Sequence, residues 1–351
     1  MTDRGTRRIA VYGLTAAGAE LASRLAESLQ GDLYLPGGLA PSYSARAFET
    51  VAGVVRENFE AYSAHVFVAA AGIVVRAVAP LLRGKDRDPG VVVLDQAGEY
   101  VVSLLSGHLG GANRLARRIG GIIGARPVVT TATDTADILA ADVLADESDM
   151  AIANLRAVRS VNSALLESKP LQVYDPEDRL GLRSGSRRGY NPEFVDDPGD
   201  MQRDRPGLAV TWRSAEPVDR DNHLLLHPRC LAVGIGCHRG AGADAILQHV
   251  VSVFERHGLA LSSIRTLASV SLRSREPGIL RAASMLEAPV AFLDREQLGA
   301  AQVPNPSEHV KKYLGVESVC EAAALIAAEG GRLLVDKTRG KGVTVAVALQ
   351  G

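Results

Sequence analysis

The sequence predicts an α/β protein with three domains, in which N-terminal and C-terminal α/β sandwiches with mostly parallel sheets flank a small middle α/β domain. Short β-branched runs alternate with longer segments rich in Ala, Leu and Arg, a pattern typical of parallel sheets covered by helices. The 351 residues exceed the size at which one hydrophobic core usually stops growing. A polar, turn-rich stretch, 183–207, interrupts the pattern. We therefore predict domains at 1–136, 137–227 and 228–351.

Five apolar runs and three longer helical segments define the predicted N-terminal domain. The expected strands span residues 9–12, 65–69, 91–94, 100–104 and 127–131. The expected helices span residues 15–29, 71–82 and 111–123. Gly31 and Gly124 stand just past two of these helices, where a glycine commonly provides a left-handed C-cap.

The rest of the chain continues the α/β pattern after a change of composition. In the middle domain we expect a helix over 154–166, a strand over 171–174, and a long exposed loop over 183–207, which is too polar to form a core. The C-terminal domain begins after Pro228. Its expected strands span residues 231–235, 264–270, 290–292, 332–335 and 343–348, and its expected helices span residues 243–257, 278–286, 307–314 and 318–327.

The composition argues against several classes of protein. Hydrophobic residues make up 46% and charged residues 23% of the chain, as in soluble globular proteins. The longest apolar stretches, such as residues 66–75, are shorter than the ~20 residues that span a bilayer, and the N-terminus lacks the apolar region of a signal peptide. A net charge of −1 gives no overall attraction to nucleic acid or to an acidic membrane. We therefore expect a cytoplasmic protein with neither of these partners.

A glycine-rich turn between a predicted strand and a basic helix is the best local candidate for a binding site. It contains Ser106, Gly107, His108, Gly110, Gly111 and Asn113. Glycines let the main chain approach a ligand, and the free N–H groups of a helix start attract anions. A tight turn whose glycines only permit packing is an equal alternative. The turn lacks the phosphate-binding patterns of nucleotide sites, so nucleotide binding is disfavoured.

A second turn of this kind follows the first strand of the C-terminal domain and contains Gly236, Cys237, His238 and Arg239. The same geometry predicts exposed N–H donors, here beside a cationic side chain. The three cysteines, Cys230, Cys237 and Cys320, lack C-x-x-C spacing, which argues against a disulfide framework or a zinc site. A structural role for Cys237 is favoured over a nucleophilic one, since no base is identifiable nearby in the sequence.

Two further charged residues have alternative interpretations. Lys337 follows a predicted buried strand and is either a solvated hairpin tip or an anion contact. Glu276 precedes Pro277 and Gly278, where an N-cap or first-turn carboxylate is the simpler interpretation.

Several blocks of the sequence, taken together, resemble one family, the cobalt-precorrin-5A hydrolases of anaerobic cobalamin biosynthesis. The matching blocks are residues 71–82, 85–95, 103–113, 130–134, 161–166, 234–240, 276–278 and 303–307, with Lys337 and Thr344. They extend over nearly the whole chain, and the stretch 183–207 is the least typical part.

The resemblance implies a hydrolase that opens the ring-A δ-lactone of cobalt-precorrin-5A, releases acetaldehyde by acting on a carbon–carbon bond, and yields cobalt-precorrin-5B. A non-catalytic tetrapyrrole-binding carrier of the same pathway is the alternative. The cobalt would arrive inside the substrate, so no cofactor and no protein metal site are expected. Expected partners are the substrate and, transiently, pathway methyltransferases; a homodimer is one option for the assembly.

The reaction that the resemblance implies suggests roles for individual residues in the matching blocks. Lactone opening needs an activated water and an oxyanion stabiliser. We expect His108 to be the general base, held neutral by the helix start, and the N–H groups of Gly110 and Gly111 to stabilise the oxyanion. The substrate-binding residues expected on this basis are Arg76, Ser106, Gly107, Gly110, Gly111, Asn113, Gly236, His238, Arg239, Glu276 and Lys337.

Overall fold

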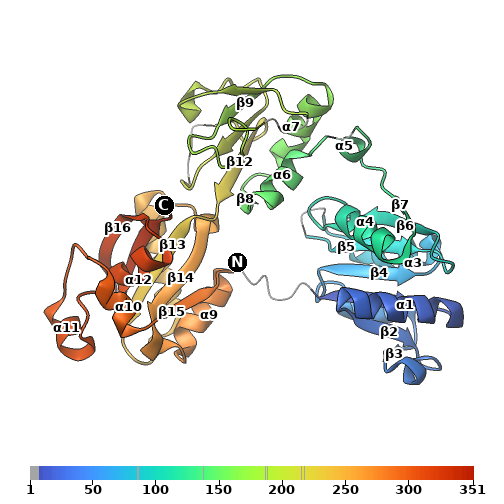
Figure 1. Cartoon of the computed structure of the whole chain (residues 1–351), viewed down its shortest axis with the longest axis horizontal. Helices are drawn as coiled ribbons and strands as arrows, with labels where there is room; N and C mark the ends of the chain where they lie inside the picture. Colours follow the sequence, from blue (N-terminus) through green and yellow to red (C-terminus); the bar gives the residue numbers. More distant parts are fainter. Residues whose placement is uncertain are drawn as a thin grey trace. The chain divides into compact units, whose positions relative to one another are not determined.

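The chain contains three separate sheets, each flanked by helices (Figure 1). The computed structural model describes residues 8–84, 87–136, 138–185, 187, 189–214, 216 and 218–351. Two compact units are present: residues 8–144 with 165–168 form one, and residues 145–164 with 169–351 form the other. Strand pairs are mostly parallel in the N-terminal and middle sheets, and two of the four pairs are parallel in the C-terminal sheet. This confirms the predicted α/β fold class.

The N-terminal sheet has seven strands in the order β3-β2-β1-β4-β5-β6-β7. Only the β5–β6 pair is antiparallel. The elements are β1 (Ile9–Gly13), α1 (Ala16–Leu29), β2 (Asp32–Pro36), a 3-10 turn (Ala40–Tyr43), β3 (Arg46–Phe48), α2 (Val51–Asn58), β4 (Ala64–Val68), α3 (Ala71–Val78), a 3-10 turn (Ala79–Leu81), β5 (Gly90–Leu94), β6 (Tyr100–Leu105), α4 (Ala112–Ile123), β7 (Arg126–Val128), α5 (Ala132–Thr135) and α6 (Ala141–Glu147).

Differences from the predicted elements have local causes. The helix expected over 71–82 becomes a 3-10 turn after Val78, because Pro80 lacks the N–H donor that would continue the α-helical hydrogen bonds. Gln30, not Gly31, takes the left-handed C-cap of α1, whereas Gly124 caps α4 as predicted. The strand β2, the edge strand β3 and the helix α2 were not predicted, since their sequences are short and mix polar with apolar residues.

The middle sheet has the order β10-β9-β11-β12-β8, with one antiparallel pair, β12–β8. Its elements are β8 (Met150–Ile152), α7 (Arg156–Leu166), β9 (Leu171–Tyr174), β10 (Pro192–Phe194), a 3-10 turn (Pro198–Asp200), β11 (Gly207–Val210) and β12 (His223–Pro228). The stretch 183–207 is not only an exposed loop, because β10 pairs with β9 and Met201 is buried. That part of the loop prediction is wrong.

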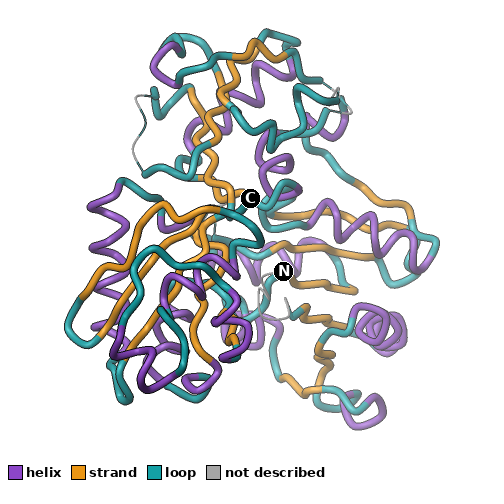
Figure 2. The backbone as a smooth tube through the Cα atoms, turned by 60° about the vertical axis from the view of Figure 1, so that its left-hand side comes forward, coloured by secondary structure: helices purple, strands orange, loops and turns teal. Residues whose placement is uncertain are grey.

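The C-terminal sheet has the order β15-β14-β13-β17-β16. Its elements are β13 (Leu231–Cys237), α8 (Ala243–His257), a 3-10 turn (Leu261–Ser263), β14 (Ile264–Val270), a 3-10 turn (Ser271–Arg273), α9 (Pro277–Met285), β15 (Val290–Leu293), α10 (Arg295–Ala300), α11 (Glu308–Leu314), α12 (Cys320–Ala327), β16 (Arg332–Arg339) and β17 (Val343–Leu349). In Figure 2 the strands of this region, in orange, run between helices in purple.

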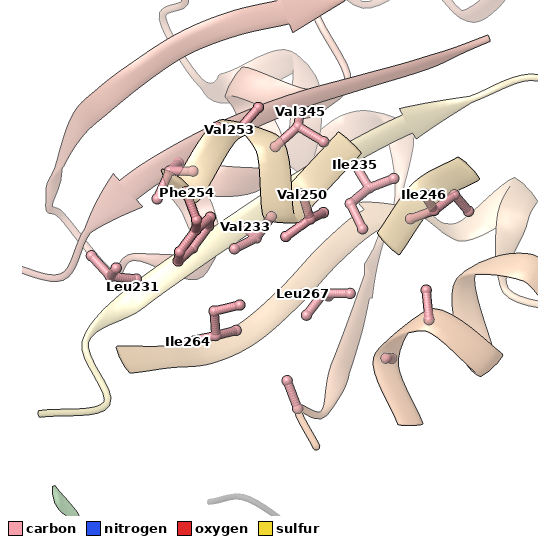
Figure 3. Packing of buried hydrophobic residues seen from close by; sticks show 14 of the residues in the cluster. Leu231, Val233, Ile235, Ile246, Val250, Val253, Phe254, Ile264, Leu267 and Val345 are labelled. Carbon is pink, nitrogen blue, oxygen red and sulfur yellow. The ribbon is translucent and has the colours of Figure 1, made fainter. Parts of the chain in front are cut away.

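Helices α8 and α12 bury different faces of the C-terminal sheet. Val250 and Phe254 of α8 pack on the strand residues Val233 and Leu267 (Figure 3). On the other face, alanines of α12 pack with Ala232 of β13. None of the helices in the described part of the chain combines the length and the apolar composition needed to cross a bilayer.

The main chain of α12 lies unusually close to β13 at Gly234. A Cβ atom at Gly234 would lie 1.8 Å from the carbonyl oxygen of Cys320 and 2.7 Å from the nitrogen of Ala324. Both neighbours are backbone atoms, so a side-chain rotation cannot relieve the overlap. Glycine is therefore required here by the contact itself.

Replacing Gly234 by alanine is expected to destabilise the second unit by about 1–3 kcal/mol or more, because the helix must move off the sheet. Gly299 of α10 has no atom within 4 Å of its Cβ position, and Gly299→Ala should change stability by about 1 kcal/mol at most. Urea unfolding of both variants measures the difference. Equal stability of the two would show that α12 does not rest on Gly234.

Candidate functional site

A basic pocket lies at the carboxyl end of β13; we call it the β13 pocket. Its volume is about 470 Å³. The side chains around it that carry, or can acquire, a positive charge are His238, Arg239, Arg273, Lys337 and Arg339. Within the described part of the chain, no aspartate or glutamate lines this pocket. Its concave shape and single sign of charge favour an anionic ligand.

Apolar groups form the remaining wall of the β13 pocket. Val310 and Tyr313 come from α11, and Cys237, Val319 and Cys320 come from β13 and the start of α12. Burial raises the pKa of the Cys237 thiol and of the Cys320 thiol, so both resist forming the nucleophilic thiolate. The cysteines therefore serve as wall residues.

Two glycines shape the edge of the β13 pocket. The Thr344 hydroxyl donates to the Gly236 carbonyl at 3.2 Å, and a Cβ at Gly236 would lie 2.5 Å from that hydroxyl. Gly342 has φ +72°, and a Cβ there would lie 2.4 Å from Nε2 of His238. The backbone N–H of His238 also donates a hydrogen bond to the Gly342 carbonyl at 3.1 Å. The hairpin glycine thus makes room for the imidazole.

The structure brings together four of the predicted substrate-binding residues, Gly236, His238, Arg239 and Lys337, around the β13 pocket. Lys337 lies within β16 and not at the hairpin tip, which falls at residues 340–342. The hairpin-tip interpretation is therefore wrong. The pocket position agrees with the alternative interpretation of Lys337 as an anion contact.

Sequence reasoning missed several side chains of the β13 pocket, among them Arg339, Arg273 and Tyr313. Arg339 stands two residues after Lys337 in β16, a spacing that could have suggested a shared face. Arg273 and Tyr313 belong to a 3-10 turn and to α11, far from the glycine turn in the sequence. No local pattern connects them with it.

Glu276 supports the neighbouring turn rather than lining the β13 pocket. Its side chain precedes α9 but makes no cap hydrogen bond to that helix. Instead, Oε1 accepts a hydrogen bond from the Gly240 N–H at 3.0 Å. With Arg281 it lines a separate open cavity of about 500 Å³. Glu276 therefore holds the turn that carries His238 and Arg239.

In the N-terminal unit, His108 lies between two carboxylates. Its Nδ1 is 3.1 Å from Asp142 Oδ2, and its Nε2 is 3.1 Å from Asp134 Oδ2. The His108 side chain is 15% exposed. The hydrogen bond to Asp142 is the main cause that raises the pKa of His108, and Asp134 contributes in the same direction against the effect of burial. The helix start was expected to disfavour the charged imidazole, but the two carboxylates instead raise the pKa of His108.

Asp134 is the centre of this polar cluster. Besides His108, it accepts a hydrogen bond from Asn113 Nδ2 at 2.8 Å and one from Arg117. Asn113 also bonds Ser103 and Thr131 through its side chain. The predicted contact Asn113 is therefore buried in the network that fixes the turn, and it is 4% exposed.

The N–H groups at the start of α4 are used inside the turn. The Gly111 N–H donates to the His108 carbonyl at 2.8 Å, and those of Ala112 and Asn113 donate to Ser106 and Gly107 at 3.2 and 3.0 Å. Gly111 therefore does not offer the free oxyanion donor that was expected.

Two other predicted contacts lie apart from the His108 cluster. Gly110 lines a cavity of about 380 Å³ together with Tyr62, Arg83 and Arg87. Arg76 is exposed, and its guanidinium donates to the Gly72 carbonyl of its own helix at 2.9 Å.

The two carboxylates should differ in their effect on His108. Asp142→Asn is expected to lower the pKa of His108 more than Asp134→Asn, because the Asp142 contact is the larger cause of the shift. Since the folded-state pKa is raised, the stability gained from charged His108 is present below a pH of about 6.5 and is lost as the pH rises through the folded pKa. NMR titration of the imidazole measures both variants. A larger effect of Asp134→Asn would contradict the assignment.

Comparison with known proteins gives matches along the whole chain. Three family descriptions match in order: Cobalamin synthesis G N-terminal at residues 53–134, Cobalamin biosynthesis central region at 139–228, and Cobalamin synthesis G C-terminus at 231–348. A solved cobalamin biosynthesis protein G homolog from Sulfolobus solfataricus covers 100% of this chain and 99% of its own at 20% identity, with a TM-score of 0.40.

Two curated relatives match almost end to end. The cobalt-precorrin-5A hydrolase of Salmonella typhimurium is 34% identical over 344 residues, which is 97% of each chain. That of Priestia megaterium is 28% identical over 368 residues, 99% of this chain and 96% of its own. Identity above 30% over nearly the full length, in agreement with the three family matches, shows that the chain belongs to the cobalt-precorrin-5A hydrolase family.

Proposed function

We propose that this protein is an enzyme, a hydrolase that opens the ring-A δ-lactone of cobalt-precorrin-5A and releases acetaldehyde to give cobalt-precorrin-5B. The observation that carries the proposal is the β13 pocket, which combines four permanent or near-permanent cations with an apolar wall and, in the described residues, no carboxylate. Membership of the family supplies the reaction, and the pocket supplies a place that fits the substrate's chemistry.

The substrate is a flat macrocycle edged by acetate and propionate groups. Arginine binds carboxylates through two parallel hydrogen bonds, so Arg239, Arg273 and Arg339 suit this edge. Val310 and Tyr313 offer apolar surface for the face of the ring. The whole chain has a net charge of −1, so the positive charge is local to the pocket.

The proposed chemistry proceeds in two bond-breaking steps. Water attacks the lactone carbonyl, and the ester C–O bond breaks to leave a carboxylate on ring A and a hydroxyl on the former meso carbon. Loss of the hydroxyl proton then breaks the carbon–carbon bond to the macrocycle, acetaldehyde leaves, and the ring accepts the electron pair and a proton. The sequence is redox-neutral and requires no oxidant. The cobalt belongs to the substrate.

His108 is our candidate catalytic residue, in the role of a general acid. Its two carboxylate partners keep it protonated to a higher pH than a free histidine, which suits proton donation to an oxygen or carbon that gains electrons. Both ring nitrogens are held by carboxylates, so donation requires one of these contacts to yield. The role of base proposed on sequence grounds is less compatible with this environment.

The purified protein is expected to release acetaldehyde from cobalt-precorrin-5A in proportion to substrate consumed. Alcohol dehydrogenase with NADH reports the acetaldehyde, and mass spectrometry reports the opened product. A carrier would bind the tetrapyrrole and leave its mass unchanged. Stoichiometric binding without acetaldehyde would therefore contradict the enzyme assignment.

Replacing His108 by alanine should lower the rate of acetaldehyde release by ~10²–10⁴-fold, the usual contribution of a general acid or base. His108→Gln keeps a hydrogen-bonding side chain and should retain the fold of the turn without restoring the rate. His257→Ala, at an exposed position ending α8, is the control. Near-normal turnover of His108→Ala would show that the Asp134–His108–Asp142 cluster only stabilises the fold.

A further inference from the structure

A carboxylate is buried directly behind the basic wall of the β13 pocket. Glu321 lies in the first turn of α12 and is 0% exposed. Its Oε2 has no hydrogen-bond partner among the described residues. A buried, incompletely paired carboxylate contributes little to stability compared with an apolar side chain of similar size. Its presence calls for another physical reason.

The other oxygen of Glu321 joins two parts of the pocket. Oε1 accepts a hydrogen bond from the Lys337 backbone N–H at 3.0 Å and one from Asn305 Nδ2 at 2.8 Å. Lys337 Nζ in turn donates to the Asn305 carbonyl at 2.6 Å. One carboxylate thus connects α12, β16 and the segment that leads into α11 (Figure 1). Each of these contributes side chains to the pocket.

The Lys337 N–H is available to Glu321 because β16 is irregular at this point. Along β17, Val347 and Val345 pair with Val335 and Thr338 of β16, so β16 has one extra residue in this interval. Such a β-bulge leaves a residue out of the ladder and turns the following side chains. The Glu321 carboxylate satisfies the N–H group that the bulge releases.

The bulge decides which side chains face the pocket. Val335 belongs to the core beneath α8, and Thr338 contacts His249 of α8 at 3.3 Å, so both lie on the α8 face. In a regular strand, Lys337 would share the face of Val335. With the bulge, Lys337 and Arg339 instead line the β13 pocket.

We propose that Glu321 is a positioning residue for substrate binding: it fixes the bulge in β16 and thereby directs Lys337 and Arg339 into the β13 pocket. Glu321 touches no substrate, because it is fully buried. Its effect is on the placement of two cations that would bind carboxylates. The inference rests on the proposed function only in naming that ligand.

The test uses four variants of the full chain and one control. Glu321→Gln keeps an oxygen acceptor for Lys337 and Asn305, Glu321→Ala removes it, and Lys337→Ala and the double variant Glu321→Ala/Lys337→Ala complete a cycle. Ala323→Gly is the control, since it weakens a buried position of α12 while the carboxylate remains.

Two measurements are made on each variant. The first is hydrogen exchange of the β16 segment by mass spectrometry, which needs no ligand. Glu321→Ala should speed hydrogen exchange there, and Glu321→Gln and Ala323→Gly should not.

The second measurement is the affinity for uroporphyrin III, a macrocycle that carries eight carboxylates, followed by fluorescence. Glu321→Ala and Lys337→Ala should each weaken binding by roughly tenfold to a hundredfold, the double variant should be no weaker than the weaker single, and Glu321→Gln should bind like the unmodified protein.

The outcomes separate this inference from the proposed function. If the unmodified protein does not bind uroporphyrin III, the assignment of the pocket to tetrapyrroles fails, and hydrogen exchange still decides the role of Glu321. If Glu321→Ala exchanges and binds like the unmodified protein, or like Ala323→Gly, the positioning role is wrong. Multiplicative loss of affinity in the double variant would also overturn it.

Discussion

The direct contact between the main chain of α12 and β13 at Gly234 is the constraint on which the rest of the candidate site depends. Gly234 has no side chain, so the start of α12 can lie flat against the strand, and no room for a Cβ remains between Gly234 and the Cys320 carbonyl. That placement makes Val319 and Cys320 a wall of the β13 pocket and puts the next residue, Glu321, within hydrogen-bond distance of β16. A comparable contact occurs at Gly278 of α9, where a Cβ atom would lie 2.0 Å from the Ala241 carbonyl oxygen. Close backbone packing, permitted only by glycine, therefore places α12 beside the β13 pocket and α9 beside the separate cavity lined by Glu276 and Arg281.

Charge in this protein is organised locally. The chain is nearly neutral overall, yet one pocket is lined by cations, and two buried carboxylates bond the main chain beside it. Glu321 bonds the Lys337 backbone, and Glu276 bonds the turn after Arg239. Both carboxylates hold main-chain N–H groups and leave the cationic side chains turned to the cavity. If the proposed function holds, this division of roles lets the pocket bind an anion without an excess of positive charge that would attract unrelated polyanions.

Much of the fold was predictable because its signals are local. Helix α8 and strand β14 match their predicted ranges, since each combines a continuous periodic pattern with clear turn residues at its ends.

The candidate site was harder to predict from the sequence than the fold. The glycine turn at Gly236 is visible in the sequence, but the bulge that exposes Lys337 and Arg339 depends on a carboxylate 16 residues earlier in the chain. The pKa of His108 likewise depends on Asp134 and Asp142, which lie 26 and 34 residues away in the sequence. The neighbouring helix start alone predicted a lowered pKa, whereas the two carboxylates raise it. Long-range hydrogen bonds, and not local pattern, decide these properties.

The central claim is that the β13 pocket binds the carboxylate edge of a cobalt-bearing tetrapyrrole. A crystal structure of the protein with cobalt-precorrin-5B, the product of the proposed reaction, tests this claim most directly. The account predicts acetate and propionate oxygens within hydrogen-bond distance of Arg239, Arg273, Lys337 and Arg339, with the macrocycle against the α11 side of the pocket. A product molecule bound elsewhere, with these four side chains free of contact to it, would contradict the account.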